Sequence, residues 1–321
     1  MVVIHVSPHT TKYVAGRCSW AYFWWLACWC GSIIAPYFIA YHMNGLWLKE
    51  AVRVQQPRAR FKHSVIVALE GTKKIGNDVL AGYHWHWSTE SSVNALFGSD
   101  VRVAEVSSVE VDDNRDGKPD TVEVTVAVPL LDGENIHQAS AALFFNYTLD
   151  DYVTMDMEGM AYVQGGSALA GSQLWVSGDL RFRQLGAIVY MTPHTLYRGS
   201  VINAANPRIN DVLFPTMLGN YAQRNLTTFI GNEQQVWTAG DGGSADGLNR
   251  FEIVVRLKIP DEQVRYIPGF WETVKKAWVQ YLAIFFVARY LIGKIEIFLH
   301  EYSVVETSVL HKQVISRKPN F

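Results

Sequence analysis

A run of acidic and amide side chains between two predicted strands is the part of this sequence best suited to chemistry. From Val111 to Thr121 the chain reads VDDNRDGKPDT, with oxygen-bearing groups at alternating positions and Gly117 for a sharp turn. A calcium ion takes about six to eight oxygen ligands at roughly 2.4 Å, and alternate spacing lets one short loop supply several of them. The pattern predicts a calcium-binding hairpin turn with these ligands: Asp112, Asn114, Asp116, the carbonyl of Lys118, and Asp120.

Two other interpretations of the acidic turn have to be weighed against this one. An EF-hand is excluded, because the flanking segments have strand periodicity and Pro119 stands where that loop needs an apolar residue. A plain polar turn stays open, since Asp and Asn side chains readily accept hydrogen bonds from their own backbone. Several carboxylates in so short a loop repel one another without a cation, which favours calcium. Calcium is the only cofactor that the sequence predicts.

The remaining residue patterns predict no catalytic centre. His84 and His86 lie on one face of a strand-like segment, but without a third ligand this pattern favours a packed strand over a metal site. Ser167 and Ser244 lie in glycine-rich stretches that predict loops, and neither matches the G-x-S-x-G nucleophile motif. The sequence contains no phosphate-binding loop and no acid–base constellation, so we expect a protein that is not an enzyme.

Asparagine sequons and cysteine positions bear on the cellular compartment. Asn146 begins the sequence N-Y-T and Asn225 begins N-L-T, and both are acceptors for N-glycosylation if this region is extracellular or lumenal. Asn146 falls in a strand-like run, which makes Asn225 the better candidate. The three cysteines, Cys18, Cys28 and Cys30, all lie near the N-terminus, so no disulfide and no cysteine-ligated zinc can form in the rest of the chain.

Strand periodicity dominates the chain from about residue 49 to residue 265. Between Thr121 and Val128, for example, valines and polar residues alternate, which gives the strand one buried face and one wet face. The runs with this pattern are Phe61–Leu69, Val101–Val111, Thr121–Val128, Ala141–Leu149, Tyr152–Val163, Gln173–Arg183 and Phe251–Ile259. They predict a mainly β protein in which residues 42–267 form one β-sandwich-like domain, large enough to bury its own core.

Two apolar segments predict membrane anchors. Ser19–Tyr41 contains no Asp, Glu, Lys or Arg, and a helix over residues 18–41 is long enough to cross about 30 Å of hydrocarbon. Its length and its tryptophans distinguish it from a cleaved signal peptide. The second segment, residues 268–293, contains Arg289, whose charge costs about 3 kcal/mol or more at mid-bilayer unless it snorkels or finds a partner. It is therefore either a second span or an interfacial helix, and residues 1–17 and 294–321 are tails.

Charge leaves the orientation of these anchors open. The net charge of -2 disfavours a nucleic-acid partner. Basic residues lie on both sides of the first span, with Lys12 and Arg17 before it and Lys49 and Arg53 after it. The positive-inside rule taken literally favours a cytosolic middle region, but long domains are translocated largely regardless of charge. The two sequons favour the opposite orientation.

Five sequence segments, spread over most of the chain, resemble those of one known family. They are GLWLKE from Gly45, DDNRDGKPD from Asp112, GSQLWVSGDLR from Gly171, YAQRNLTT from Tyr221 and PGFWETVKKAWVQY from Pro268. Together they resemble the transmembrane protein 231 family, and the last segment is the most specific because it is long and unusual in composition. The resemblance implies two spans, cytosolic termini and an extracellular β domain. Arg289 departs from the apolar residue expected there.

The resemblance also implies a cellular role. It implies a location in the ciliary membrane at the transition zone, in the module associated with Meckel and Joubert syndromes. The implied partners are tectonic proteins, meckelin, B-nine domain proteins, a coiled-coil C2-domain scaffold and membrane lipids. The implied function is structural: formation of the diffusion barrier that controls entry of membrane proteins into the cilium, and cilium assembly.

Two functions of other classes remain to be compared with this role. A calcium-dependent adhesion or receptor-accessory ectodomain at the cell surface is the alternative that the acidic turn favours. A membrane-tethered hydrolase would need a polar pocket with a perturbed acid–base pair, and the sequence offers none.

Overall fold

The computed structural model of the chain describes residues 11–14, 16, 19–43, 46–75, 79–98, 101–203, 205, 207–240, 249–302, 304–305 and 308–311. The chain forms two compact units. One comprises Glu50–Ile267, and the other comprises Met1–Lys49 together with Pro268–Phe321. The residues on either side of Glu50–Ile267 in sequence therefore belong to one and the same unit.

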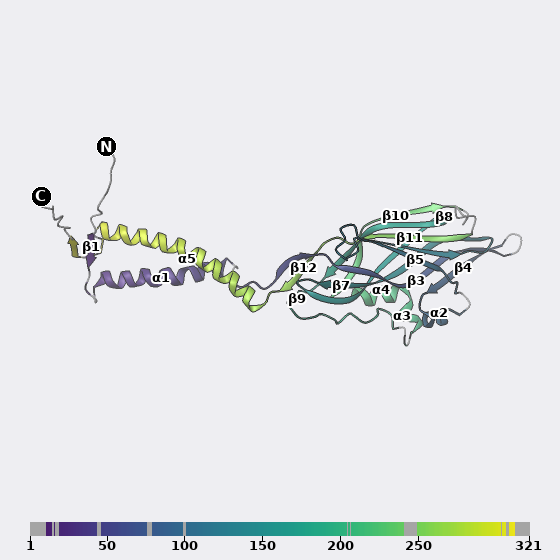
Figure 1. The fold of residues 1–321 in the computed structure, drawn as a ribbon, viewed down its shortest axis with the longest axis horizontal. Helices are drawn as coiled ribbons and strands as arrows, with labels where there is room; N and C mark the ends of the chain where they lie inside the picture. Colours follow the sequence, from purple (N-terminus) through teal and green to yellow (C-terminus); the bar gives the residue numbers. More distant parts are fainter. Residues whose placement is uncertain are drawn as a thin grey trace, which may run out of the picture. The chain divides into compact units, whose positions relative to one another are not determined.

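The Glu50–Ile267 unit, called the β domain below, consists mainly of strands (Figure 1). The mainly β prediction is confirmed. Its strands are β2 (Ala51–Gln55), β3 (Arg58–Ile75), β4 (Val79–Ser88), β5 (Glu105–Val111), β6 (Thr121–Pro129), β7 (Glu134–Asp150), β8 (Thr154–Gln184), β9 (Ile188–Val189), β10 (Leu226–Ala239), β11 (Arg250–Lys258) and β12 (Glu262–Ile267). The described residues of this domain also form the short helices α2 (Ser91–Phe97), α3 (Ile209–Val212) and α4 (Phe214–Ala222).

In the part of the β domain that the structure describes, the strands form one curled sheet of eight strands and a small sheet of three. The large sheet has the order β4-β3-β7-β8-β11-β6-β5, with β10 also paired to β8, and the small sheet has the order β2-β12-β9. The sequence predicted a sandwich-like domain. The structure differs in that a single hydrogen-bonded sheet curls around the core, because β8 takes part in both of its halves.

Strand β8 joins the two halves of the large sheet. Its first part pairs with β7 up to Gly166, and its second part pairs with β10 from Gly171 onward while β11 runs parallel to it on the other side. Between these parts the register with β7 shifts: four residues of β8, 167–170, lie opposite His137 alone, so that β8 has three more residues than its partner before Gly171 pairs with Ile136. The sequence predicted two separate strands here, which is wrong: β8 is continuous over 31 residues. The glycine-rich backbone stays extended through the shift.

Glycines allow β8 and β10 to approach closely. A Cβ atom at Gly171 would lie 2.4 Å from a ring carbon of Trp237, and one at Gly178 would lie 2.5 Å from the Cγ2 atom of Ile230. Any larger residue at these positions would push β10 away from β8. The close packing is one reason why the Gly171–Arg181 segment has so distinctive a composition.

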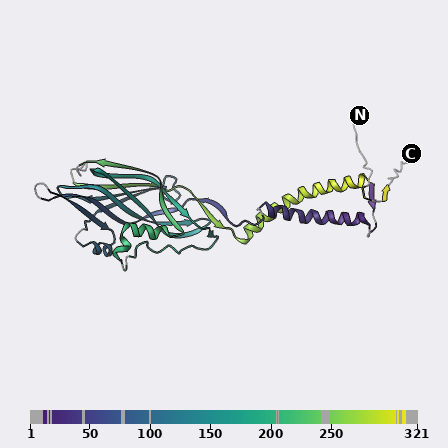
Figure 2. The ribbon, with the colours of Figure 1, turned by 180° about the vertical axis from the view of Figure 1, so that it is seen from behind.

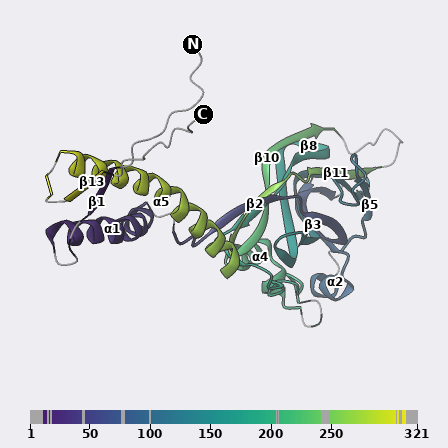
Figure 3. The same ribbon diagram turned by 60° about the vertical axis from the view of Figure 1, so that its left-hand side comes forward.

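The strand alternation seen in the sequence produces the core. Val122, Val124, Val126 and Val128 of β6 are all buried, while the residues between them are half-buried. The other face of the sheet is covered by α2, α3 and α4, which pack on a buried cluster that includes Phe144 of β7 (Figure 2 and Figure 3). The sequence did not predict these helices, since four to nine residues are too few to display a helical period.

The second unit, called the helix pair below, contains α1 (Trp20–His42), α5 (Phe270–Glu301), β1 (Thr11–Val14) and β13 (Ser308–His311). The side chain of Ser19 accepts a hydrogen bond from the Tyr22 N–H and caps α1. Of the described residues, only the stretch in α1, with a mean hydropathy of 1.5, is both long and apolar enough to cross a bilayer. A second span in α5 is therefore not confirmed. Helix α5 also continues to Glu301, beyond Gly293, where the sequence suggested that it ends.

Small side chains allow the two helices to lie side by side, as Figure 1 shows. Ser32, Pro36 and Ala40 of α1 are buried at intervals of one helical turn, which lets the backbones approach. The Tyr281 hydroxyl of α5 donates to the Ile33 carbonyl oxygen of α1 at 3.2 Å. Arg289 has a partner on its own helix, since its guanidinium lies 3.6 Å from a carboxylate oxygen of Glu296.

Candidate functional site

The acidic turn connects β5 to β6 in an antiparallel hairpin. Val111 and Thr121 are the last paired residues before the turn, and the Asp120 N–H donates to the Val111 carbonyl at 2.8 Å. The backbone turns through Arg115 at φ 60° and Gly117 at φ 83°. The left-handed conformation at the second of these positions explains the glycine. The flanking strands confirm the reason for excluding an EF-hand.

The acidic and amide side chains of the turn point at their own backbone. Asp112 accepts from the N–H groups of Asp116 at 3.3 Å and Gly117 at 2.8 Å. Asn114 accepts from the Asp116 N–H at 2.9 Å, and Asp116 accepts from the Lys118 N–H at 2.8 Å. These bonds make a complete polar turn without an ion. The same oxygens keep further lone pairs, so the donor set also suits calcium, and the calcium site stays a prediction.

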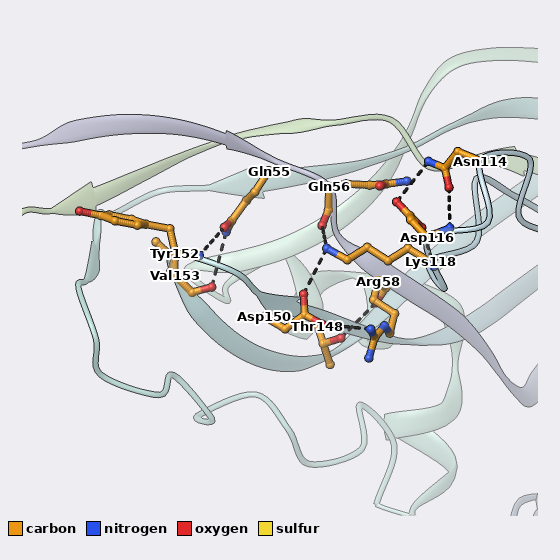
Figure 4. A network of polar contacts seen from close by, with 10 residues as sticks. All are labelled: Gln55, Gln56, Arg58, Asn114, Asp116, Lys118, Thr148, Asp150, Tyr152 and Val153. Atoms are coloured by element: carbon orange, nitrogen blue, oxygen red, sulfur yellow. Dashed lines mark hydrogen bonds and ion pairs between the residues drawn. The ribbon is translucent and has the colours of Figure 1, made fainter.

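The other side of the turn is tied to the start of β3 and the end of β7 (Figure 4). The Lys118 ammonium lies 3.2 Å from an Asp150 oxygen and donates to the Gln56 carbonyl at 3.0 Å. The Gln56 amide in turn donates to Asp120 at 2.9 Å. Asp150 also pairs with Arg58 at 3.3 Å. The Lys118 ammonium thus lies beside the carboxylates. It reduces their mutual repulsion, which the sequence argument took as a reason to expect a metal ion.

The structure therefore brings the predicted residues together and adds three that sequence reasoning missed. Asp112, Asn114, Asp116 and Asp120 are linked through the turn, but Lys118 contributes its ammonium to the network rather than only a carbonyl. The missed residues are Gln56, Arg58 and Asp150. No local pattern points to them, because they reach the turn only through the pairing of β3 with β7. In the described part of the chain, no group of three or more His, Cys, Asp or Glu side chains is arranged to hold a metal ion.

Both sequon asparagines are exposed on the β domain. Asn146 lies within β7, as the sequence predicted, between Arg60 of β3 and Glu158 of β8. Asn225 follows α4 in a bend before β10. An exposed asparagine in a bend is the more accessible acceptor, which agrees with the preference for Asn225. Glycosylation of either residue stays a prediction.

The other residues considered as candidates in the sequence lie in strands or outside the described residues. His84 and His86 lie in β4, where the His86 ring stacks on the Phe97 ring of α2 with centroids 4.6 Å apart, as expected for a packed strand, while His84 is exposed. Ser167 lies within β8, and its prediction as a loop residue is wrong. Ser244 lies outside the described residues.

A buried ion pair holds Glu134 at the start of β7. Its carboxylate is completely buried and receives both arms of the Arg102 guanidinium, the Leu131 N–H at 2.8 Å and the Lys73 ammonium at 3.5 Å. Burial by itself raises the pKa of Glu134. The hydrogen bonds and the two positive charges outweigh that effect and bring the pKa below its ordinary value.

A second buried carboxylate, Glu262 of β12, has the opposite balance. It accepts from the Phe182 N–H at 3.1 Å and lies 3.4 Å from the Arg181 guanidinium. Burial raises the pKa of Glu262 above its ordinary value, and these partners reduce the rise without removing it. The comparison with Glu134 shows what a second cation and a bidentate arginine contribute.

A hydroxyl network covers the edge of β8 around Met160, in the part of the strand that does not pair with β10. The Tyr221 hydroxyl accepts from the N–H groups of Thr228 at 2.8 Å and Met160 at 3.1 Å. The Thr228 hydroxyl accepts from the Met160 N–H and donates to the Met160 carbonyl, at 2.8 and 2.9 Å. Burial raises the pKa of Tyr221, so it stays a neutral phenol. The YAQRNLTT segment thus has a structural role at both of its ends.

The chain is similar to known proteins over almost its whole length. A family model described as Transmembrane protein 231 matches residues 1–309. Transmembrane protein 231 of Mus musculus is 35% identical over 308 residues, covering 95% of this chain and 94% of the relative. The Homo sapiens protein of that name is 35% identical over 301 residues, with 94% and 92% covered, and the Xenopus tropicalis protein is 31% identical over 305 residues, with 95% and 94% covered.

Comparison with solved structures gives a much weaker likeness. A proton-activated chloride channel solved by cryo-EM aligns with 87% of this chain and 97% of its own, at a TM-score of 0.26 and 9% sequence identity. At this TM-score the alignment carries no argument about fold or function. The sequence relatives are therefore the comparison that bears on this chain.

Proposed function

Because this chain belongs to the transmembrane protein 231 family, we propose that it is a non-enzymatic structural component of the ciliary membrane at the transition zone. In this role it contributes to the diffusion barrier for membrane proteins and to cilium assembly. Its proposed partners are tectonic proteins, meckelin, B-nine domain proteins and other components of the same zone. The β domain docks on the extracellular parts of these partners, and the helix pair holds it at the membrane.

Two strand pairs that flank the helices are the observation that supports the proposed membrane anchor. β1 precedes α1 and pairs with β13, which follows α5. β2 follows α1 and pairs with β12, which precedes α5. Each helix therefore connects the same two strand pairs, and α5 must cross whatever α1 crosses. A membrane-spanning α1 makes α5 the second span, despite its weaker hydropathy, and leaves both tails on one side.

The proposed orientation puts both tails in the cytosol and residues 42–267 outside it. The exposed side chains of Asn146 and Asn225 support this, since an oligosaccharide can be attached at each without unfolding a strand. Protease added to intact ciliated cells should cleave within residues 42–267 and leave tags at both termini intact. Glycosidase treatment should lower the apparent mass of the wild type but not of the Asn146→Gln/Asn225→Gln variant. Cleavage of either tag on intact cells would contradict this orientation.

The location is tested by imaging a tagged full-length protein in ciliated cells against basal-body and axoneme markers. A ring confined to the ciliary base is expected for a barrier component. A uniform plasma-membrane signal would instead favour the alternative, a calcium-dependent adhesion or receptor-accessory protein. The acidic turn is the observation behind that alternative, because its oxygen atoms converge on one short loop. Ligand binding that disappears on calcium chelation would distinguish it from a scaffold.

A further inference from the structure

An apolar pocket of about 340 Å³ lies between the last turns of α1 and the first turns of α5, within the helix pair. Two of the segments most distinctive in the sequence meet there. The GLWLKE segment contributes Leu46 and Trp47, and the PGFWETVKKAWVQY segment contributes Ala277, Trp278 and Tyr281, facing Tyr37 of α1. The structural role of a scaffold does not by itself explain why both segments place aromatic rings around one pocket.

Internal contacts hold the α5 wall of this pocket in place. Two contacts hold Tyr281: its hydroxyl donates a hydrogen bond to the Ile33 carbonyl, and its ring stacks on the Phe285 ring with centroids 6.0 Å apart. Trp278 packs against Tyr281 at 6.3 Å. The Thr273 hydroxyl donates to the Gly269 carbonyl at 3.2 Å and so braces the first turn of α5. Walls that are already ordered lose little side-chain freedom when a ligand binds.

The charges around the pocket favour an uncharged ligand. None of the residues that line it is charged, and its exposed surface is almost wholly apolar. The neighbouring Lys276 lies 3.3 Å from a Glu272 carboxylate oxygen, one turn earlier on α5. A lipid phosphate requires cationic donors, of which this lining has none. An uncharged lipid with one hydroxyl needs only one polar contact, so an almost wholly apolar lining suits it.

We propose that this pocket binds a sterol from the membrane. A sterol is flat and rigid, so it stacks on ordered aromatic rings and has few rotations to lose, whereas a flexible acyl chain loses many. The volume falls at the lower end of the range of roughly 300–1,000 Å³ found for small-molecule sites. Tryptophan and tyrosine at the end of a span lie at headgroup depth, where the sterol hydroxyl also lies. This inference rests on the proposed two-span anchor.

The test uses the full-length protein in lipid nanodiscs that contain a photoactivatable cholesterol analogue. After irradiation, mass spectrometry should locate the label on peptides that contain Trp47 or residues 277–281. Ala277→Trp fills the pocket and should reduce this labelling at least tenfold. Val279→Trp is the matched control: it places the same ring two residues along α5, on a side chain that is 60% exposed and outside the lining, and should leave labelling unchanged.

Two further arms separate the possible failures. A photoactivatable phosphatidylcholine that labels the same peptides as efficiently as the sterol would overturn the proposal and leave an ordinary lipid contact. If Ala277→Trp does not yield a monodisperse protein, Trp47→Ala, outside both helices, decides the question by reducing the labelling of residues 277–281. Extraction of the protein from membranes at alkaline pH would refute the anchor itself. An embedded protein without label in the pocket would refute only the sterol site.

Discussion

The β domain and the helix pair place the same kinds of side chain in opposite environments. Phe145 and Phe251 in the β domain are 0% exposed, whereas Phe38 of α1 and Phe286 of α5 are 55% and 66% exposed. Burying a phenylalanine contributes about 1.5–3 kcal/mol in water, so the β domain gains this free energy from its own fold. The exposed rings of the helix pair gain no such free energy within the chain, and of the described helices α1 is long and apolar enough to gain it in a bilayer.

Polar groups differ between the two regions in the same way. The β domain encloses the carboxylates of Glu134 and Glu262 and supplies each with hydrogen bonds from its own strands. The helix pair has an exposed apolar surface, and its two described ion pairs, Lys276 with Glu272 and Arg289 with Glu296, both lie along α5. We therefore expect substitutions in the β domain to change its free energy of unfolding, and substitutions in the helix pair to change membrane anchoring.

Arg102→Leu should cause the largest loss of stability. It leaves the Glu134 carboxylate buried without its bidentate partner, which costs about 3–5 kcal/mol. The measurement is denaturant unfolding of the full-length protein in detergent, followed by tryptophan fluorescence. Trp85, whose ring lies 5.5 Å from the Arg102 guanidinium, is a nearby buried probe.

Arg198→Leu is the control for this effect. Arg198 also pairs with a carboxylate, at 3.1 Å from Asp156, but its side chain is 73% exposed, so its removal should cost less than about 1 kcal/mol. Equal losses in the two variants would mean that burial does not determine the strength of these pairs. The contrast between a β domain that buries and pairs its own polar groups and a helix pair that leaves its apolar surface exposed would then lose its basis.

Tyr221→Phe should cost about 1–3 kcal/mol, because the buried N–H group of Thr228 loses its acceptor and that of Met160 loses one of two. Tyr147 supplies the matched control. It is equally buried, but its hydroxyl has no hydrogen-bond partner among the described residues, and burial raises its pKa well above the ordinary value. Tyr147→Phe should be neutral or stabilising, and it leaves the Asn146 sequon intact. Equal effects of the two substitutions on unfolding would remove the edge-closing role of Tyr221.

Asp116→Ala should cost about 1 kcal/mol through the lost acceptor of the Lys118 N–H. Unfolding is measured with chelator and again with millimolar calcium. Stabilisation of the wild type by calcium, absent in Asp116→Ala, would support the calcium site, since a ligand at 100 times its Kd adds about 2.7 kcal/mol. Asp113→Ala, in the same turn but outside the predicted ligands, should keep any calcium effect. No calcium effect in the wild type would leave only a polar turn.

Glu262→Gln should be neutral or stabilising by up to about 1 kcal/mol at neutral pH. The folded protein raises the pKa of Glu262, so the stability that this group contributes is present below the ordinary carboxylate pKa and is lost as the pH rises through the raised value. Glu134 has the opposite sign: its contribution is present above the ordinary pKa and is lost as the pH falls below it. The advantage of Glu262→Gln over the wild type should thus grow as the pH rises above the ordinary carboxylate pKa of about 4. A variant that is less stable at pH 7 would show that the Arg181 contact outweighs burial.

The sequence predicted those features that repeat locally. The alternation of valines in β6 and the uncharged run of α1 follow directly from the periods of a strand and of a span, and both are present. The division of β8 into two strands was wrong because Gly165 and Gly166 suggest a turn, whereas pairing with β7 holds them extended. Local pattern cannot anticipate a partner strand.

The polar networks cannot be predicted from local sequence patterns, for the same reason. Arg102 and Glu134 are 32 residues apart, and nothing near either residue indicates the other. The acidic turn was recognisable because its residues are adjacent, but its ammonium partner depends on Asp150 at the far end of β7. Spacing along the chain therefore predicted the turn, and only the register of the sheet determines what surrounds it.

Arg289→Leu should have the smallest effect on the β domain, below about 0.5 kcal/mol, because Arg289 and its partner Glu296 both lie on α5, outside that domain. On α5 it removes a costly charge but leaves Glu296 without the guanidinium 3.6 Å away. The double variant Arg289→Leu/Glu296→Leu should anchor in membranes as firmly as the wild type in alkaline extraction. If both variants remain embedded yet no longer co-purify with partners that the wild type retains, the ion pair serves an intramembrane contact. A change in β-domain unfolding would instead show that the two regions are coupled, against the separation on which the comparison depends.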